Sequence, residues 1–250
     1  MIFALMSALA LIGDAFWLRG VGAEQTGQLK GAWREVLRAS AVPLFAVAYV
    51  YGTTSAIYIA FAADHMQGGG GVPGVPVAAT SALIFVVYGA FGLFGPLTAR
   101  IEDTIGLTWL VRGLMLSGAA SVALAALGAG SWVGLIGSAG LQGIHVMMTS
   151  ALVAMWSERQ FPMMPALGFT AALLAMAVGS VLGPGIAGLA ADAFGTEMMF
   201  LSLAALPASL ALLLRPQDET EAIAPERGVR SRCDPAPGHK ATSPVGPKRR

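Results

Sequence analysis

Six long apolar stretches, separated by short polar or glycine-rich connections, dominate the hydropathy pattern of this chain. They cover residues 42–63, 77–99, 105–129, 132–155, 166–191 and 198–214. Most of them reach the ~20 residues that an α-helix needs to cross the hydrocarbon core of a bilayer. Their apolar character is continuous and does not alternate from residue to residue, as it would in the strands of a membrane barrel. The pattern therefore predicts an all-α integral membrane protein with six spans.

The chain outside these stretches falls into three parts. Residues 1–18 are apolar but short and carry Asp14, which predicts part of one further membrane helix. A signal peptide is the alternative, although no basic residues precede the apolar part. Residues 19–41 are polar and predict a cytoplasmic linker, either a helix on the membrane surface or a solvated segment. Residues 215–250 are rich in Pro and charged side chains, which predicts a disordered cytoplasmic tail.

Composition supports a membrane protein and excludes several other classes. Only 12% of the residues are charged and the mean hydropathy is +0.69, whereas soluble proteins carry about a quarter charged residues. The basic residues lie in connections and in the tail, so the net charge of +1 does not indicate a nucleic-acid partner. The single cysteine, Cys233, allows no intrachain disulfide and no cysteine metal cluster. No cofactor is expected, since the glycine run at 68–71 has neither the preceding strand nor the following Lys of a phosphate-binding loop.

The charges also predict an orientation in the membrane. When the connections are assigned alternately to the two sides, one side receives Arg19, Lys30, Arg34, Arg38, Arg100, Arg159 and Arg215, with Arg112 just inside the following helix. The other side receives Asp64, His65, Asp192 and Glu197, without Lys or Arg. The positive-inside rule places the first set, and hence the C-terminus, in the cytoplasm. The expected location is the plasma membrane, a bacterial inner membrane.

Two short segments stand out within or between the spans. The sequence GPLTARIEDTIG at 95–106 joins two apolar runs and predicts a water-facing charged turn between membrane helices; an ordinary charged turn is the alternative. The fifth apolar run carries a set of helix-breaking residues: Gly179, Gly183, Pro184 and Gly188. These residues predict a bent helix that lets one bundle rock against another, although helix packing alone explains them equally well.

These segments resemble the major facilitator superfamily of transporters. The matching residues of the first segment are Gly95, Ala99, Arg100, Asp103 and Gly106. After Gly106 the chain departs from the family pattern, with Leu107 and Thr108 in place of basic residues, and Arg112 is the nearest substitute for the ionic latch. The second match is GSVLGPGIAGLAADAFG at 179–195, and together with SERQFPMMPALGFT before it this resembles transporters of the YbfB/YjiJ type.

The resemblance implies the carboxyl-terminal six-helix bundle of such a transporter, built from two three-helix inverted repeats. Residues 42–214 would form this bundle, 1–18 would be the sixth helix of the whole transporter, and 19–41 would link the two halves. The missing amino-terminal half, or a second chain, is then an expected partner. In this family the first span of the bundle lines the central cavity together with the fourth.

His145 is the only Asp, Glu, Lys, Arg or His that lies deep in any of the six spans. An ionisable group at that depth is costly, and an unperturbed imidazole titrates near neutral pH. His145 is therefore expected to bind substrate or to relay a proton; a neutral His bonded to a neighbouring helix is the alternative. Gln142, one turn earlier, shares its face. Glycines at every third position nearby, Gly134, Gly137, Gly140 and Gly143, are expected to serve helix packing.

Hydroxyl-bearing side chains form an unusual polar band in the first span. Tyr51, Ser55 and Tyr58 are spaced to share one helical face, and Tyr88 in the next span is a weaker candidate of the same kind. Such hydroxyls suit a small organic anion or a neutral solute. The alternative is that Ser hydroxyls bond to their own helix and the tyrosines pack or anchor at the membrane interface.

The leading functional hypothesis is a secondary transporter, or part of one, that moves a small organic solute by alternating access. Protons are the expected coupling ion, since His145 is the sole buried titratable candidate. A non-transporting membrane partner or sensor that uses its basic tail is the alternative. A membrane enzyme is less favoured, because the chain lacks His-Glu-x-x-His, Gly-x-Ser-x-Gly and any pair of deep carboxylates. No catalytic or metal-binding residue is therefore expected.

Overall fold

The computed structural model describes residues 41–214, and all the regular elements in this range are helical. The predicted partial helix at 1–18, all but the last residue of the linker and the predicted tail lie outside the described residues. The helices are α3 (Val42–Gly68), η3 (Val77–Ala79), α4 (Thr80–Gly92), η4 (Gly95–Leu97), α5 (Thr98–Ile105), α6 (Leu107–Leu127), α7 (Trp132–Gln160), α8 (Pro165–Phe194) and α9 (Thr196–Leu213). Six of the resulting segments are long and apolar enough to cross a membrane, which confirms the predicted number of spans in this part of the chain.

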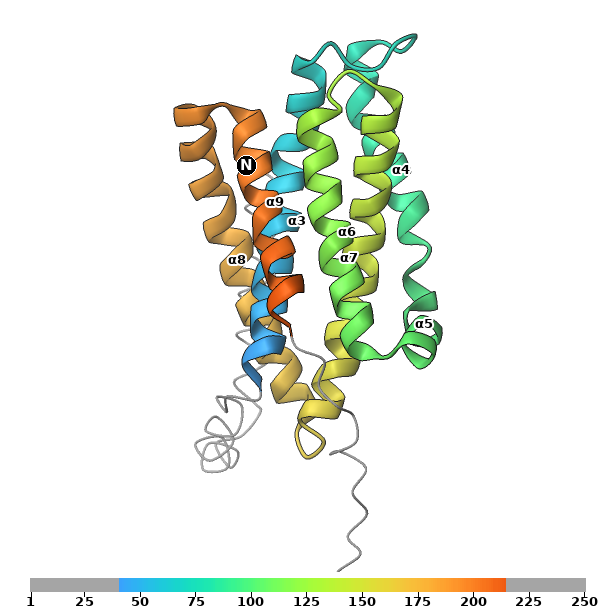
Figure 1. Cartoon of the computed structure of the whole chain (residues 1–250), viewed down its shortest axis with the longest axis vertical. Coiled ribbons are helices and arrows are strands. Elements are labelled where there is room, and N and C mark those ends of the chain that lie inside the picture. Colours follow the sequence, from blue (N-terminus) through green and yellow to red (C-terminus); the bar gives the residue numbers. More distant parts are fainter. Residues whose placement is uncertain (1–40, 215–250) are drawn as a thin grey trace, which may run out of the picture. The chain divides into compact units, whose positions relative to one another are not determined.

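The helices run up and down and form a bundle (Figure 1). Helix α3 packs along α8, α6 packs along both α7 and α9, and α4 packs along α7. Short connections at 69–76, 128–131 and 195 lie at one end of the bundle, here called the acidic end. The turns at Gly106 and at 161–164 lie at the opposite end, here called the basic end, where α3 begins and α9 finishes.

The second span was predicted as one uninterrupted helix, but the structure divides it into several helical segments. Helix α4 ends at Gly92, and a short 3-10 turn, η4, leads into the separate short helix α5. Pro96 lies in the first turn of η4, where its missing N–H costs nothing. The Thr98 hydroxyl donates to the Gly95 carbonyl over 2.5 Å at the start of α5.

The prediction of a charged turn over 95–106 is therefore wrong, because this stretch is helical as far as Ile105. The chain reverses direction at a single residue, Gly106, whose φ is +81°. Glycine has no Cβ, so it adopts this conformation readily. The polar stretch folds as an amphipathic helix at the end of the bundle, with Glu102 buried and Arg100 and Asp103 exposed.

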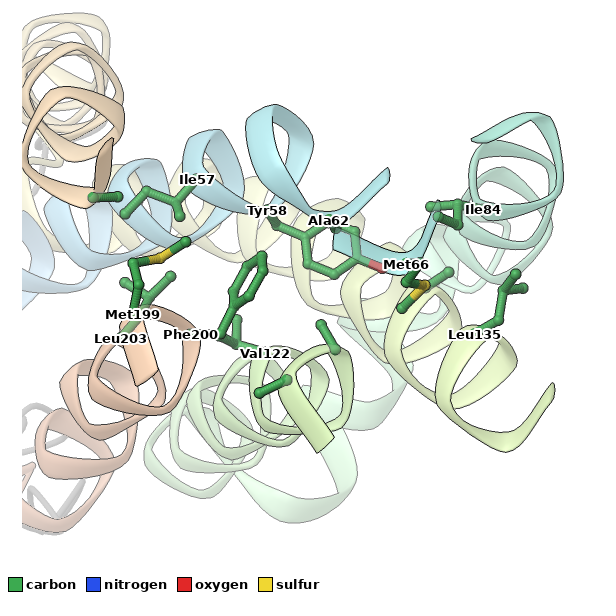
Figure 2. Packing of buried hydrophobic residues seen from close by; sticks show 14 of the residues in the cluster. Ile57, Tyr58, Ala62, Met66, Ile84, Val122, Leu135, Met199, Phe200 and Leu203 are labelled. Carbon is green, nitrogen blue, oxygen red and sulfur yellow. The ribbon is translucent and has the colours of Figure 1, made fainter. Parts of the chain in front are cut away.

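Two hydrophobic clusters fill the interior at different depths. The cluster nearer the acidic end gathers side chains from α3, α4, α6, α7 and α9 (Figure 2): Ile57, Tyr58, Met66, Ile84, Val122, Leu135, Met199 and Phe200. The cluster nearer the basic end includes Leu44, Val47, Leu114, Met115, Met148, Leu152 and Trp156. Along each of α3, α6 and α7 a few residues separate one cluster from the other, and these residues form most of the candidate site.

Candidate functional site

His145 lies in the middle of α7 and is fully buried. Its Nδ1 is 2.8 Å from the backbone carbonyl oxygen of Leu114 on α6. A carbonyl oxygen can only accept a hydrogen bond, so Nδ1 carries the hydrogen and Nε2 carries the lone pair of the neutral ring. Nε2 is buried and has no hydrogen-bond partner.

The His145 ring lies in a niche formed by Gly118, one turn after Leu114 on α6. A Cβ at position 118 would lie 2.9 Å from Cε1 and Nδ1 of the ring and 3.0 Å from Nε2. Any larger residue would therefore displace the imidazole. Sequence reasoning missed Gly118, because it is one of many small residues in an apolar run and only the position of the ring distinguishes it.

The third side of the niche is formed by Tyr51 of α3. Its ring meets the imidazole edge-on, with the ring centroids 5.7 Å apart and the planes inclined by 63°. Tyr51 is only 8% exposed, so its side chain is buried together with the histidine. Two predicted site residues from different spans, Tyr51 and His145, are thus in contact.

Antiparallel helices α6 and α7 are joined at this depth by side chains that bond to backbone. Three groups cross the contact: Ser121 Oγ donates to Ser138 O over 2.8 Å, Ser117 Oγ to Leu141 O over 3.1 Å, and His145 Nδ1 to Leu114 O. The residue numbers of the partners fall along α6 (121, 117, 114) while they rise along α7 (138, 141, 145). The three bonds therefore follow one another along the contact between the two antiparallel helices. Such bonds stabilise helix pairs in lipid, where burial of apolar surface contributes little to association.

The contacts between α3 and α7 define the rest of the site. Ser138 Oγ and the Tyr58 hydroxyl are 3.0 Å apart at one end, and Tyr51 meets His145 at the other. The two pairs are separated by seven residues along α3 (51 to 58) and by seven residues along α7 (138 to 145). Because these helices are antiparallel, Thr54 lies at the same level as Gln142, between the two pairs. The name polar seam is used below for the six residues Tyr51, Thr54, Tyr58, Ser138, Gln142 and His145.

Most of the polar seam lies between the two hydrophobic clusters, at the middle of the bundle, and its Tyr58–Ser138 end lies within the cluster nearer the acidic end. Several fully buried polar atoms there or one helical turn away have no hydrogen-bond partner: Thr54 Oγ1, both amide atoms of Gln142, His145 Nε2 and Thr149 Oγ1. Burying such a group without a partner costs ~1–3 kcal/mol in proteins. The seam therefore presents several donors and acceptors, and the imidazole is its one basic side chain.

The remaining predicted solute-binding residues lie beside the polar seam. Ser55 follows Thr54 on α3 and is half-buried, with a buried hydroxyl that has no partner. Tyr88 on α4 is half-buried, and its carbonyl oxygen approaches Gly143 so closely that a Cβ there would lie 2.1 Å away. The structure thus brings Tyr51, Tyr58, Gln142 and His145 into one seam and leaves Ser55 and Tyr88 at its edge.

The predicted latch residues of the 95–106 segment are arranged differently from the expectation. Glu102 forms a two-pronged ion pair with Arg159 at the end of α7, with Nη1–Oε1 at 2.5 Å and Nη2–Oε2 at 2.8 Å. Arg112, expected to substitute in the latch, donates from Nε and Nη2 to the carbonyl of Leu214 and lies over the Trp109 ring. It therefore fastens the end of α9, and the Glu102–Arg159 pair is the contact that sequence reasoning missed.

Two glycines of the fifth span, Gly179 and Gly183, lie in close contact with α3. A Cβ at Gly179 would lie 2.4 Å from the carbonyl oxygen of Tyr49, and one at Gly183 would lie 3.0 Å from Thr53 Cγ2. Gly188 has only Phe61 nearby, at 3.9 Å. Helix α8 continues through Pro184 without interruption of its helical assignment.

Two hollows lie outside the polar seam. One of about 490 Å³ at the acidic end is lined by Asp64, His65 and Glu197 among others. The other, of about 280 Å³, is a mostly apolar groove between α3, α8 and α9. Within residues 41–214 no group of three or more His, Cys, Asp or Glu side chains is placed to hold a metal ion.

No protein-family model matches this chain, and no curated protein or solved structure is significantly similar to it. The chemistry of the site is therefore inferred from the chain itself. Its main feature is an ionisable imidazole among unpartnered polar atoms, at mid-depth in a bundle of membrane-length helices.

Proposed function

We propose that this chain is a membrane transporter, or the carboxyl-terminal half of one, that moves a small organic solute by alternating access. The observation that carries the proposal is the polar seam between the two hydrophobic clusters. Ionisable groups at mid-membrane depth are rare and mark substrate or proton paths. Secondary transporters bind their substrates and coupling ions near the bilayer midplane, which is where the seam would lie.

The packing of α3, α4, α7 and α8 supports the two three-helix repeats of a major facilitator bundle. If α3–α6 and α7–α9 are the repeats, the first helix of each packs on the second helix of the other. Both contacts involve glycine: Gly52 and Gly179 between α3 and α8, and Gly143 between α7 and α4. Equivalent contacts of equivalent chemistry are what an internal repeat requires.

The exposure of the spans supports a partner within the membrane. The first, third and fourth spans are mostly buried, whereas the second span, α8 and α9 are mostly exposed. In the proposed transporter the second span and α8 would face an amino-terminal half or a second chain, and the solute would bind between the halves. Ser55 and Tyr88, at the edge of the polar seam, are the half-buried candidates nearest the surface.

The distribution of charge supports a bacterial inner-membrane location with a cytoplasmic C-terminus. Within residues 41–214 the three arginines, Arg100, Arg112 and Arg159, all lie toward the basic end of the bundle. The acidic end carries Asp64, Asp192 and Glu197. By the positive-inside rule the basic end faces the cytoplasm.

Transport is tested in proteoliposomes that contain a pH-sensitive dye, with the chain alone and with any amino-terminal half that the upstream reading frame encodes. A panel of small organic acids, amines and neutral solutes is added outside. We expect at least one solute to change the internal pH with the wild-type protein and to do so at least tenfold more slowly with His145→Ala, because the proton acceptor is gone. An unchanged rate in a folded His145→Ala protein would exclude a role for His145 in transport.

A further inference from the structure

The hydrogen bond to Leu114 and the Gly118 niche together restrict the His145 ring to one orientation. The carbonyl holds the hydrogen on Nδ1, and the glycine leaves room for the ring only where that bond forms. Both groups belong to consecutive turns on one face of α6, so a single helix contact determines the position and the tautomer of the imidazole. The free lone pair on Nε2 is then left buried and unpartnered.

We propose that Nε2 of His145 is the proton-accepting atom of the polar seam and that Gly118 is its positioning residue. This inference rests on the proposed function, in which a proton moves through the seam. Protonation of Nε2 leaves the bond from Nδ1 to Leu114 intact, because an imidazolium donates from both nitrogens. The ring can therefore gain and lose a proton without moving.

The surroundings of the ring contain few other ionisable groups. Helix α3 presents Tyr51 to the ring, and α4 carries Tyr88 at the edge of the seam. The only ionisable residue of α6 is Arg112, which bonds to Leu214 at the basic end. The charged residues of α7 itself, Glu158 and Arg159, lie at the same end. Among the described residues of the seam, His145 is thus the one side chain with a basic nitrogen that can take up a proton.

Nitrogen NMR tests this assignment without a transport substrate. The full chain is labelled with ¹⁵N-histidine, reconstituted in lipid bilayers and compared with His145→Asn to identify the His145 signals. At neutral pH we expect a protonated Nδ1 and an unprotonated Nε2, with Nε2 gaining a proton as the pH is lowered. A wild-type His145 that carries its hydrogen on Nε2 would overturn the proposal.

Gly118→Ala tests the niche, and Gly113→Ala is the matched control. Gly113 lies on the same helix, and a Cβ there would have no atom within 4 Å. We expect Gly118→Ala to convert His145 to a mixture of tautomers or to the Nε2–H form, and Gly113→Ala to leave the spectrum unchanged. An unchanged His145 spectrum in Gly118→Ala would remove Gly118 from its positioning role.

His145→Asn keeps the proposal testable if Gly118→Ala does not fold. The Asn amide nitrogen takes the place of Nδ1 and can donate to Leu114, but no atom replaces Nε2. We expect wild-type thermal stability and an at least tenfold slower solute-driven pH change. Suppose that the wild type shows the Nδ1–H tautomer but His145→Asn changes the internal pH at the wild-type rate. The tautomer assignment would then stand, but proton acceptance at Nε2 and the proposed role of His145 in transport would both be refuted.

Discussion

Glycines set the distance between α3 and α8. A Cβ at Gly52 would lie 2.2 Å from the Met176 carbonyl oxygen, and one at Gly179 would lie 2.4 Å from that of Tyr49. Every other residue carries a Cβ, so only glycine allows the two backbones to approach this closely. Such close approach favours helix association in lipid, because it increases van der Waals contact where apolar burial contributes little.

Gly179→Ala is expected to destabilise the bundle, and Gly185→Ala is its control on the same helix. The added methyl group at 179 forces α3 and α8 apart, with a cost of ~1–3 kcal/mol for overpacking. A Cβ at Gly185 would have no atom within 4 Å, so this change should be neutral or stabilise the helix by up to ~1 kcal/mol. Thermal unfolding in detergent measures both; equal melting temperatures for the two variants would contradict the close contact.

Sequence reasoning named four of the six residues of the polar seam as candidates, but it named neither Thr54 and Ser138 nor the glycine beside the imidazole. Tyr51, Gln142 and His145 are conspicuous as polar residues in apolar runs, and the structure brings them together. Gly118 carries no such signal, since its importance comes from a ring on another helix. A residue's own chemistry is visible in a sequence, whereas the space that it leaves for a neighbour is not.

Helix α5 illustrates the scale of single elements. Its sequence was expected to form a turn, yet it folds as an amphipathic helix that places Glu102 against Arg159 of α7. Glu102 is 5% exposed on its side chain and Arg159 52%. The carboxylate is thus removed from water, and the arginine compensates for this with two charge-assisted hydrogen bonds.

Glu102→Gln is expected to loosen α5, with Asp103→Asn as the matched control. Both changes remove one negative charge from adjacent positions, but Asp103 is exposed. Loss of the two-pronged pair should cost ~1 kcal/mol and mainly affect local opening of α5. Hydrogen exchange should accelerate in residues 98–105 of Glu102→Gln and remain at the wild-type rate in Asp103→Asn. Equal acceleration in both variants would show that charge, and not this pair, holds the helix.

The glycine stripe of α7 also acts at the scale of the element. Residues three apart on a helix are rotated by about 60° relative to one another, so the stripe winds half-way around α7. Accordingly Gly134 and Gly137 face Gly128 and Leu124 of the α6 end, whereas Gly140 and Gly143 face Phe91 and Tyr88 of α4. These contacts agree with the packing role expected for the glycines, and one stripe packs against two neighbouring helices, α6 and α4.

The bundle carries all the arginines of residues 41–214 toward one end, whereas carboxylates lie at both ends. The connection at 69–76 lies at the acidic end and the connection at 161–164 at the basic end. Each connection carries an exposed residue suited to labelling, Pro76 in the first and Met163 in the second. Their accessibility from the two sides of a cell membrane therefore reports the orientation of the protein.

Single-cysteine labelling tests that orientation. After Cys233→Ser, Pro76→Cys should react with a membrane-impermeant maleimide in intact cells, and Met163→Cys should react only after the cells are permeabilised. The physical reason is that the arginine-bearing end is retained in the cytoplasm. The reverse labelling pattern would invert the proposed topology, including the cytoplasmic C-terminus.

The sequence by itself determined the membrane class of this protein, its six spans, the separation of charge between alternate connections and the polar residues within apolar runs. Each of these is a local property, readable from the hydropathy and charge of neighbouring residues. Only the tertiary structure decided which polar residues meet, how Gly118 and Leu114 hold His145, and that Glu102 pairs with Arg159. These contacts join residues far apart in the chain, so they depend on the register and spacing with which whole helices pack.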